Sequence, residues 1–199
     1  MKINENTQIS GKKIVLVPYD RCHVLKYHEW MKSEELQALT ASEPLSLQQE
    51  YEMQQSWRLD EKKCTFIVLD SEVYNSNHHD EISSMVGDVN LFFNEPDFPH
   101  SAEIEIMIAE PWARGQGRGK EALCSMMRYG TDKLGIQRFT AKVGLANNTS
   151  LRLFEKIGFR EISRSEIFQE VTLELPVSEE LLKTLILQTP CYSIEDHIK

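Results

Sequence analysis

The hydrophobic and polar positions of the chain fall into runs that predict alternating strands and helices. Short apolar runs rich in β-branched and aromatic residues favour strands, whereas apolar positions spaced three or four residues apart favour helices. The strands expected on this basis cover residues 13–17, 65–69, 85–93, 102–109, 139–143, 158–162 and 167–175.

Helical spacing occurs between these runs. We expect helical structure over residues 20–58, broken near Pro44, and helices over 117–134 and about 149–157. Gly135 follows the second of these, where a glycine suits the end of a helix. A short amphipathic helix begins at Ser178, and residues 74–80 form a polar loop. This order predicts an α/β fold, a mixed sheet of about seven strands with helices on both faces.

Length, charge and cysteine usage narrow the classes of function. With 199 residues, 41% of them hydrophobic, the chain suits a single domain with a sizeable core. A net charge of −9 argues against nucleic-acid or anionic-membrane binding. The absence of a long apolar run predicts no membrane span. The four scattered cysteines and the polar N-terminus indicate a reduced protein of the cytosol or the nucleus, and a cytoplasmic location is expected.

A basic, glycine-rich segment interrupts this acidic background, between the expected strand 102–109 and the expected helix 117–134. Glycines let the backbone approach a ligand closely, and the first turn of a helix offers unpaired N–H groups and a positive dipole end. Together these features predict a pyrophosphate-binding loop. Its residues are Arg114, Gly115, Gln116, Gly117, Arg118, Gly119 and Lys120.

Other nucleotide-binding motifs fit this loop poorly. An ATP-binding P-loop requires Ser or Thr after its lysine, but Lys120 precedes Glu121, and Arg114 stands where the first glycine belongs. A dinucleotide fingerprint around Gly117 and Gly119 is weak, because no acidic residue ends the next strand to bind a ribose. A glycine-rich turn without a ligand is the plain alternative. It is disfavoured because glycines, cations and the strand–loop–helix order coincide.

A second motif follows the next strand. Asn147, Ser150, Phe154 and residues 158–159 have the spacing Asn-x-x-Ser-x-x-x-Phe-x-x-x-Gly-Phe. With the Arg-x-x-Gly-x-Gly pattern of the loop, this resembles the two signatures of the GNAT superfamily of N-acetyltransferases, over about residues 13–175. The resemblance implies the GNAT (acyl-CoA N-acyltransferase) fold with a mostly antiparallel sheet, over residues 1–176, with 177–199 a helical tail packed on it or extending from it. It also implies acetyl-CoA as cosubstrate and an amine as acceptor.

Four further segments are similar to one eukaryotic branch of this superfamily, regarded as acetylating tubulin at protein N-termini. They cover residues 27–31, 39–44, 86–92 and 168–173. The resemblance implies a protein substrate, possibly tubulin; we expect a monomer or weak dimer that binds neither nucleic acid nor membrane. Two alternatives stay open: a small-molecule amine acetyltransferase, or a partner-binding module, for example for microtubules, with weak or no catalysis.

The resemblance also implies roles for particular residues. A backbone N–H near Ile108 or Ala109 would contact the acetyl carbonyl and stabilise the oxyanion. Asn147 would meet the pantetheine arm or hold a water, although helix capping is its competing role. Ser150 would contact the cofactor. Phe154 occupies a cofactor-facing position where many relatives carry Tyr as the acid, and phenylalanine cannot donate a proton.

Two carboxylates on the strand before the loop are the candidate bases. Strand alternation places Glu103 and Glu105 on one face with Met107 and Ala109, and the intervening isoleucines on the other. Acidic residues on an internal strand indicate a wet groove, and a neighbouring like charge raises one pKa toward neutrality. An exposed acidic face is the alternative reading. Glu105 is favoured because it lies nearer the loop.

No metal site is expected from the sequence. His78, His79 and Asp80 carry ligand-type side chains, but their polar segment lacks a partner motif at metal-binding spacing.

Overall fold

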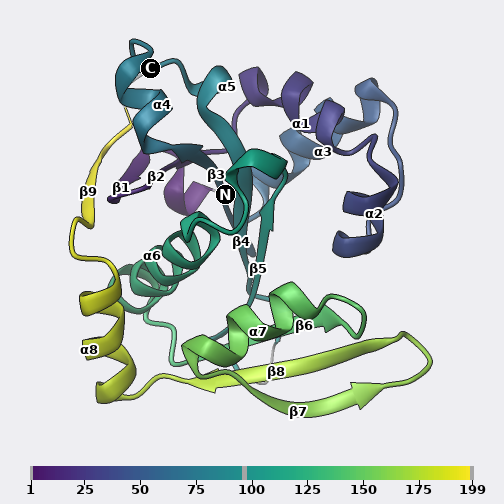
Figure 1. Cartoon of the computed structure of the whole chain (residues 1–199), viewed down its shortest axis with the longest axis vertical. Helices are drawn as coiled ribbons and strands as arrows, with labels where there is room; N and C mark the ends of the chain where they lie inside the picture. The colour runs from purple at the N-terminus through teal and green to yellow at the C-terminus, as the bar shows by residue number, and fades with distance from the viewer. Residues whose placement is uncertain (1, 96–97, 198–199) are drawn as a thin grey trace.

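One twisted sheet organises the molecule, and helices cover both of its faces (Figure 1). The computed structural model describes residues 2–95 and 98–197. Within these residues the sheet has nine strands in the order β7-β8-β6-β5-β4-β3-β2-β1-β9. The strands are β1 Thr7–Ser10, β2 Ile14–Pro18, β3 Lys63–Asp70, β4 Met85–Phe92, β5 Ser101–Ile108, β6 Arg138–Gly144, β7 Arg160–Ser165, β8 Glu170–Pro176 and β9 Ser193–Asp196.

The seven expected strands are confirmed as β2 to β8, and the expected total of about seven was too low by two. The additional strands β1 and β9 pair with each other at one edge of the sheet. Each has only four residues, and all four residues of β9 are exposed, so neither segment carries a strong hydrophobic pattern. β1 contributes only Ile9 to the hydrophobic core of one sheet face, and β9 pairs with β1 through backbone hydrogen bonds without burying any of its own residues.

The helices agree with the sequence except over residues 71–84, where the structure has two short helices that the sequence did not predict. The structure has α1 Val24–Trp30, α2 Glu34–Thr40, α3 Leu47–Leu59, α4 Ser71–Ser76, α5 Glu81–Ser84, α6 Arg118–Leu134, α7 Asn148–Ile157 and α8 Glu179–Gln188, with short 3-10 turns η1 Lys2–Asn4, η2 Arg21–His23 and η3 Pro111–Ala113. The expected polar loop at 74–80 was partly wrong, because its first residues complete α4. The carboxylate of Asp70 caps this helix by accepting a hydrogen bond from the Val73 N–H at 2.8 Å.

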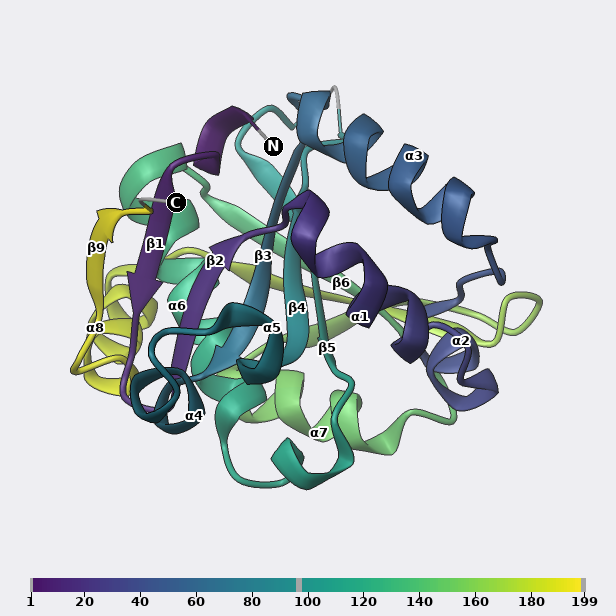
Figure 2. The ribbon, with the colours of Figure 1, turned by 90° about the horizontal axis from the view of Figure 1, so that it is seen from above.

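Two hydrophobic cores lie on opposite faces of the sheet. Ile14 and Leu16 of β2 pack into the core that α6 covers, whereas Val15 and Val17 pack into the core that α1 covers. This alternation is the period-two pattern of a strand buried on both faces. Figure 2 shows α1 and α3 on one side of the central strands and α6 on the other.

Glycines bound the long helix α6. Gly117 precedes it with φ of 88° and Gly135 ends it with φ of 67°, both in the left-handed region that favours glycine. The predicted end of the helix at Gly135 is therefore confirmed.

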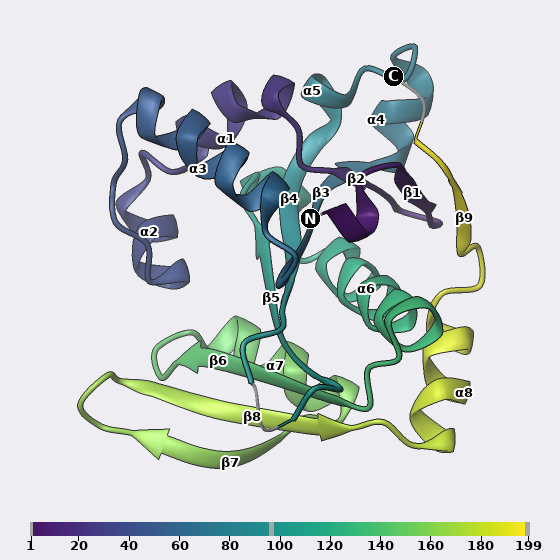
Figure 3. The ribbon, with the colours of Figure 1, turned by 180° about the vertical axis from the view of Figure 1, so that it is seen from behind.

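The tail belongs to the same core and the same sheet. Ser178 caps α8, and Leu181 and Leu185 are buried in the core beside α6. Beyond α8 the chain runs along the molecule to β9 (Figure 3). No helix in the described ranges is both long and apolar enough to cross a membrane.

The strands β5 and β6 form the only parallel pair of the described sheet, and they separate after a short contact. Ser101, Ala102 and Glu103 pair with residues 138–140, and the two strands then diverge. β5 continues beside β4 as far as Ile108, whereas β6 continues beside β8 as far as Gly144. Figure 1 shows β6, β7 and β8 leaving in a different direction from β4 and β5. This divergence opens the sheet in its middle.

Candidate active site

A cleft of about 780 Å³ lies where β5 and β6 diverge. Its walls come from β3, β4, β5 and β6, from α1 to α3, from α7 and from the turn between β7 and β8. Five residues singled out from the sequence line it together: Glu103, Glu105, Asn147, Ser150 and Phe154. They are up to 51 positions apart in the chain, and the opening of the sheet brings them together.

The glycine-rich loop lies at the carboxyl end of β5 and leads into α6. Gly115 and Gly117 have φ values of +71° and +88°, which side chains rarely adopt. A Cβ on Gly119 would lie 3.3 Å from Cγ1 of Ile108, so this glycine permits the close approach of α6 to β5. The Lys13 ammonium donates a hydrogen bond to the Gln116 carbonyl at 2.7 Å and fixes the loop from outside.

The two arginines of the loop are held by the protein itself. Arg114 donates to the carbonyls of Ile108 and Ala109 at 2.8 and 3.1 Å and to the Glu35 carboxylate at 2.9 Å. Arg118 forms an ion pair with the buried carboxylate of Asp70. Both guanidinium groups therefore fix the loop against β5 and β3, in addition to adding positive charge there.

Two lysines from different helices line a second, smaller hollow. They are Lys120 of α6 and Lys156 of α7, and the hollow of about 40 Å³ reaches α8. Lys120 lies in the first turn of α6, where its positive charge adds to the attraction of this helix end for an anionic ligand.

The ends of β4 and β5 distinguish the two candidate oxyanion donors. The N–H of Ala109 donates to the Val86 carbonyl at 2.8 Å and is therefore already used. Ile108 lies opposite Gly87 in the antiparallel ladder. Because successive residues of such a ladder point their N–H groups to opposite sides, the Ile108 N–H faces the gap between β5 and β6.

The two glutamates of β5 have different surroundings. Glu103 accepts a hydrogen bond from the Lys142 ammonium of β6 at 2.9 Å. Glu105 remains accessible to solvent but stands inside the concave cleft. Partial removal from bulk water, together with the nearby charges of Glu103 and Asp88, raises its pKa to about 7. The expected sharing of one strand face by Glu103, Glu105 and Met107 is confirmed. All three residues line the cleft, and Met107 also packs into the core that α1 covers.

Sequence analysis missed a buried charged group in the floor of the cleft. The Lys63 side chain of β3 is 4% exposed, and its ammonium lies 2.9 Å from the ring centre of Trp57 and 4.2 Å from that of Phe92. Burial lowers its pKa to about 7. Asp88 and Asn90 of β4 share this floor. The sequence held a signal for Asp88 and Asn90, because they are two polar residues spaced by two among the apolar residues of β4.

The second motif supplies one wall of the cleft. The Asn147 side chain accepts a hydrogen bond from the Ser150 N–H at 3.0 Å and so caps α7, its competing role. Phe154 is 3% exposed and contacts the edge of Phe159 at a ring separation of 4.9 Å. Its ring provides an apolar surface without a proton to donate.

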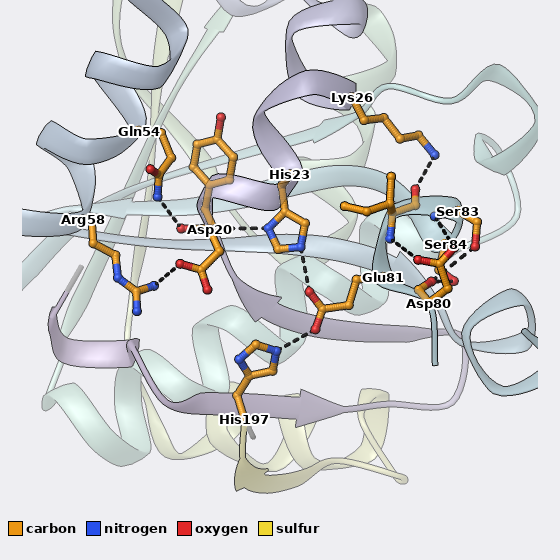
Figure 4. Close-up of polar contacts among 12 residues, drawn as sticks. Asp20, His23, Lys26, Gln54, Arg58, Asp80, Glu81, Ser83, Ser84 and His197 are labelled. Atoms are coloured by element: carbon orange, nitrogen blue, oxygen red, sulfur yellow. Dashed lines mark hydrogen bonds and ion pairs between the residues drawn. The ribbon is translucent and has the colours of Figure 1, made fainter. Parts of the chain in front are cut away.

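A separate cluster of ligand-type side chains surrounds Glu81 (Figure 4), and none of its residues lines the cleft. Glu81 of α5 bonds both histidines, His23 Nε2 at 2.7 Å and His197 Nε2 at 2.6 Å. The His23 Nδ1 accepts the Asp20 N–H at 3.0 Å, and Cys22, His23 and Glu81 offer ligand-type atoms within 4.8 Å of one another. These hydrogen bonds join the end of the chain to α5 and η2, so we interpret the cluster as structural.

Comparisons with known proteins agree with this geometry. A family model described as an acetyltransferase (GNAT) domain matches residues 13–160. An N-acetyltransferase 9-like protein of Nematostella vectensis is 63% identical over 174 residues, covering 87% of this chain and 88% of that protein. The human protein named alpha/beta-tubulin-N-acetyltransferase 9 is 54% identical over 191 residues, covering 95% of this chain and 92% of its own length.

The fold also matches solved structures. A spermidine N-acetyltransferase of Vibrio cholerae, in complex with CoA and spermine, superposes with a TM-score of 0.68 at 20% identity, covering 82% of this chain and 95% of that one. At this identity the likeness concerns the fold alone. The family model and the close relatives are decisive: the chain belongs to the GNAT family of acetyltransferases and is an acyltransferase enzyme.

Proposed function

We propose that this acetyltransferase transfers the acetyl group of acetyl-CoA to the N-terminal amine of a protein, with tubulin as the candidate substrate. The observation that carries the proposal is the Glu105 carboxyl, which has a pKa of about 7 and stands in the cleft near the end of β5. Tubulin comes from the names of close relatives in human, mouse and fly.

The loop has the features that a CoA diphosphate requires. Its glycines allow close backbone approach, and the first N–H groups of α6 have no partner within the helix. Residues 114–120 would hold the diphosphate, and Asn147, Ser150 and Phe154 would line the path of the pantetheine arm. When bound, acetyl-CoA supplies an acyl thioester, whose carbonyl carbon is open to attack by an amine.

Each step of acetyl transfer would depend on a different group of the protein or on solvent. Glu105 takes a proton from the acceptor's ammonium group, which restores the lone pair on the nitrogen of the amine. The Ile108 N–H stabilises the oxyanion, a contribution of about 3–4 kcal/mol in other acyl-transfer sites. Phe154 supplies no proton, so solvent protonates the departing thiolate. A thiol with a pKa of about 8.5 is a competent leaving group without an acid.

The shape of the cleft favours a polypeptide over a small amine. One side is formed by Leu39 and Ala41 at the end of α2, and the other by Phe168 at the turn between β7 and β8. The Phe168 side chain is 76% exposed and Leu39 is 43% exposed. Exposed apolar side chains on both sides of a groove suit a chain that lies along it.

Acetylation of a synthetic peptide tests the proposal. We expect turnover of acetyl-CoA with a ten-residue peptide that copies the N-terminus of β-tubulin, and none with the same peptide already acetylated at its N-terminus. Spermidine serves as the small-amine control. Faster turnover of spermidine than of the peptide would favour a small-molecule acetyltransferase, and no turnover of any amine would favour a partner-binding module.

A further inference from the structure

A single carboxylate joins the first turn of α6 to the turn between β1 and β2, at residues 11–13. The Lys12 N–H donates to Glu121 Oε1 at 2.5 Å, and the Lys13 N–H donates to Glu121 Oε2 at 3.1 Å. Glu121 is 9% exposed, so its carboxylate depends on these two backbone donors. Hydrogen bonds to a carboxylate are stronger than those between neutral groups. The contact spans 109 positions of the chain and connects the helix to the start of β2.

Gly11 provides the space for this contact. A Cβ at Gly11 would lie 2.6 Å from Glu121 Oε1, closer than atoms that are not bonded approach one another. The backbone of Gly11 is outside the left-handed region, unlike that of Gly117, so the conformation of the turn does not require a glycine. The position of the Glu121 carboxylate does require one. A side chain at position 11 would displace that carboxylate or shift the turn.

The backbone of Glu121 is bound to the loop at residues 114–120. Its N–H donates to the Gly117 carbonyl at 3.0 Å, a bond that closes the first turn of α6. The Lys13 ammonium bonds the neighbouring carbonyl, that of Gln116. The turn at residues 11–13 therefore holds the loop at two adjacent residues, directly at Gln116 and through Glu121 at Gly117. The two arginines of the loop fasten it to β3 and β5, and Glu121 adds β2 as a third strand.

The charge of Glu121 is opposite to what an anion-binding helix end requires. A carboxylate in the first turn of α6 would repel a diphosphate unless its charge were compensated elsewhere. The two N–H groups of the turn at residues 11–13 compensate it. The first N–H groups of α6 have no partner within the helix and remain for a ligand. Contact with the turn thus accounts for a carboxylate beside the expected cofactor site.

We propose that Glu121 is a positioning residue for the cofactor: its bonds to the turn at residues 11–13 hold the N–H groups of the loop in the geometry that binds the diphosphate of acetyl-CoA. Glu121 touches neither the cofactor nor the acceptor in this arrangement. Donors that are already ordered bind a ligand more tightly, because binding does not have to order them. The inference rests on the proposed function and deepens it, since it assigns part of the cofactor affinity to a contact outside both signature motifs.

Glu121→Ala tests this role, because alanine keeps a good helix former at this position and removes the carboxylate. We expect the dissociation constant for acetyl-CoA, measured by calorimetric titration, and the KM for acetyl-CoA to rise about tenfold, as for a lost hydrogen bond to a charged group. The kcat at saturating acetyl-CoA should change less than about threefold, since Glu105 and Ile108 are untouched. Amide hydrogen exchange should quicken in the loop and stay the same in β6 to β8.

Gly11→Ala breaks the same contact from the other side, and it decides the question alone if Glu121→Ala does not fold. We expect it to weaken acetyl-CoA binding by a similar factor. In the Glu121→Ala background it should add no further loss, because both substitutions remove one contact. Glu179→Ala, in the exposed first turn of α8, is the matched control for loss of a carboxylate from a helix start. It should keep the wild-type affinity and hydrogen exchange.

Three results would overturn the inference: wild-type affinity for acetyl-CoA in Glu121→Ala or Gly11→Ala, an equal loss of affinity in Glu179→Ala, or fully additive losses in the double variant. Turnover of the peptide by the wild type is measured in parallel. If the wild type binds acetyl-CoA and acetylates the peptide while one of these results holds, only the role of Glu121 fails. If the wild type binds no acetyl-CoA, the proposed function fails, and the inference fails with it.

Discussion

The loop at residues 114–120 and the floor of the cleft are the two halves of the proposed site, and they are built in different ways; the residues of the loop do not themselves line the cleft. The loop is one continuous segment, and Arg114 fastens it to carbonyls only five and six positions away. The floor takes Lys63, Asp88 and Glu105 from three different strands. A ligand-binding motif that is contiguous is visible in a sequence, whereas one assembled across a sheet is not.

The two halves also differ in their electrostatics. In the loop, Arg118 is paired with Asp70, and this pairing makes the segment rigid. In the floor, burial lowers the pKa of Lys63 to about 7 and raises that of Asp88 to about 6, and partial removal from water with the charges of Glu103 and Asp88 raises the pKa of Glu105 to about 7. The loop is thus suited to holding a ligand of fixed charge, and the floor to exchanging protons near neutral pH.

Gly119→Asp gives the largest expected effect and acts on the loop alone. The new side chain meets Ile108 and places a negative charge where the diphosphate would bind, so we expect acetyl-CoA affinity to fall about 100-fold or more. Calorimetric titration measures this. Lys133→Asp, at the exposed far end of α6, is the control for added negative charge. Unchanged affinity in Gly119→Asp would remove the loop from the cofactor site.

Glu105→Gln acts on the floor alone. We expect kcat to fall about 100-fold while acetyl-CoA affinity is kept, because general-base catalysis contributes at least about this much. Glu105 must be ionised to accept a proton, so wild-type kcat/KM should be high above pH 7 and fall as pH drops through about 7. The variant should lose this dependence.

Glu103→Gln is the matched control for that experiment. Its carboxylate is paired with Lys142, and we expect less than about a tenfold loss of kcat. A larger loss in Glu103→Gln than in Glu105→Gln would reverse the assignment of the base.

Phe168→Ala tests the outer wall of the cleft, at the turn between β7 and β8. Removing this ring from the side of the cleft should raise the KM of the peptide about fivefold and leave that of acetyl-CoA unchanged, since one apolar contact is lost. Ile167→Ala is the control, because its side chain is 88% exposed and does not line the cleft. Equal effects of the two substitutions would argue against a peptide lying along this wall.

Glu81→Gln gives the smallest expected effect and lies outside both halves. The substitution should lower the free energy of unfolding by about 1–2 kcal/mol at pH 7 by weakening two charge-assisted hydrogen bonds. Burial would raise the Glu81 pKa, but the bonds from both histidines outweigh it and lower that pKa. The stabilisation is therefore present above the usual carboxyl pKa and is lost as pH falls through the lowered one.

Chemical denaturation at pH 7 and at pH 4 measures this difference, which should shrink at the lower pH. Glu161→Gln, which breaks an exposed pair with Arg164, is the control and should leave stability unchanged. Acetyl transfer by Glu81→Gln should equal that of the wild type; a loss of activity would connect this cluster to the site.

Part of the fold and site followed from the sequence because the relevant interactions are local. The apolar runs of β2 and β3 are visible in consecutive residues, and so are the glycines that bound α6. Glu103 and Glu105 were found for the same reason, since two carboxylates break the pattern of one strand. The α4 segment was misread because a single capping carboxylate, Asp70, organises residues that look polar and irregular.

The sequence by itself determined the order of β2 to β8 with the helices α6, α7 and α8, the loop at residues 114–120 and the carboxylate pair of β5. Only the tertiary structure decided that β5 and β6 separate after Glu103, that Lys63 and Asp88 lie in one floor with Glu105, and that β9 completes the sheet beside β1. The physical reason is that pKa values and binding geometry depend on burial and on neighbours that are distant in the chain. These exist only once the sheet has assembled.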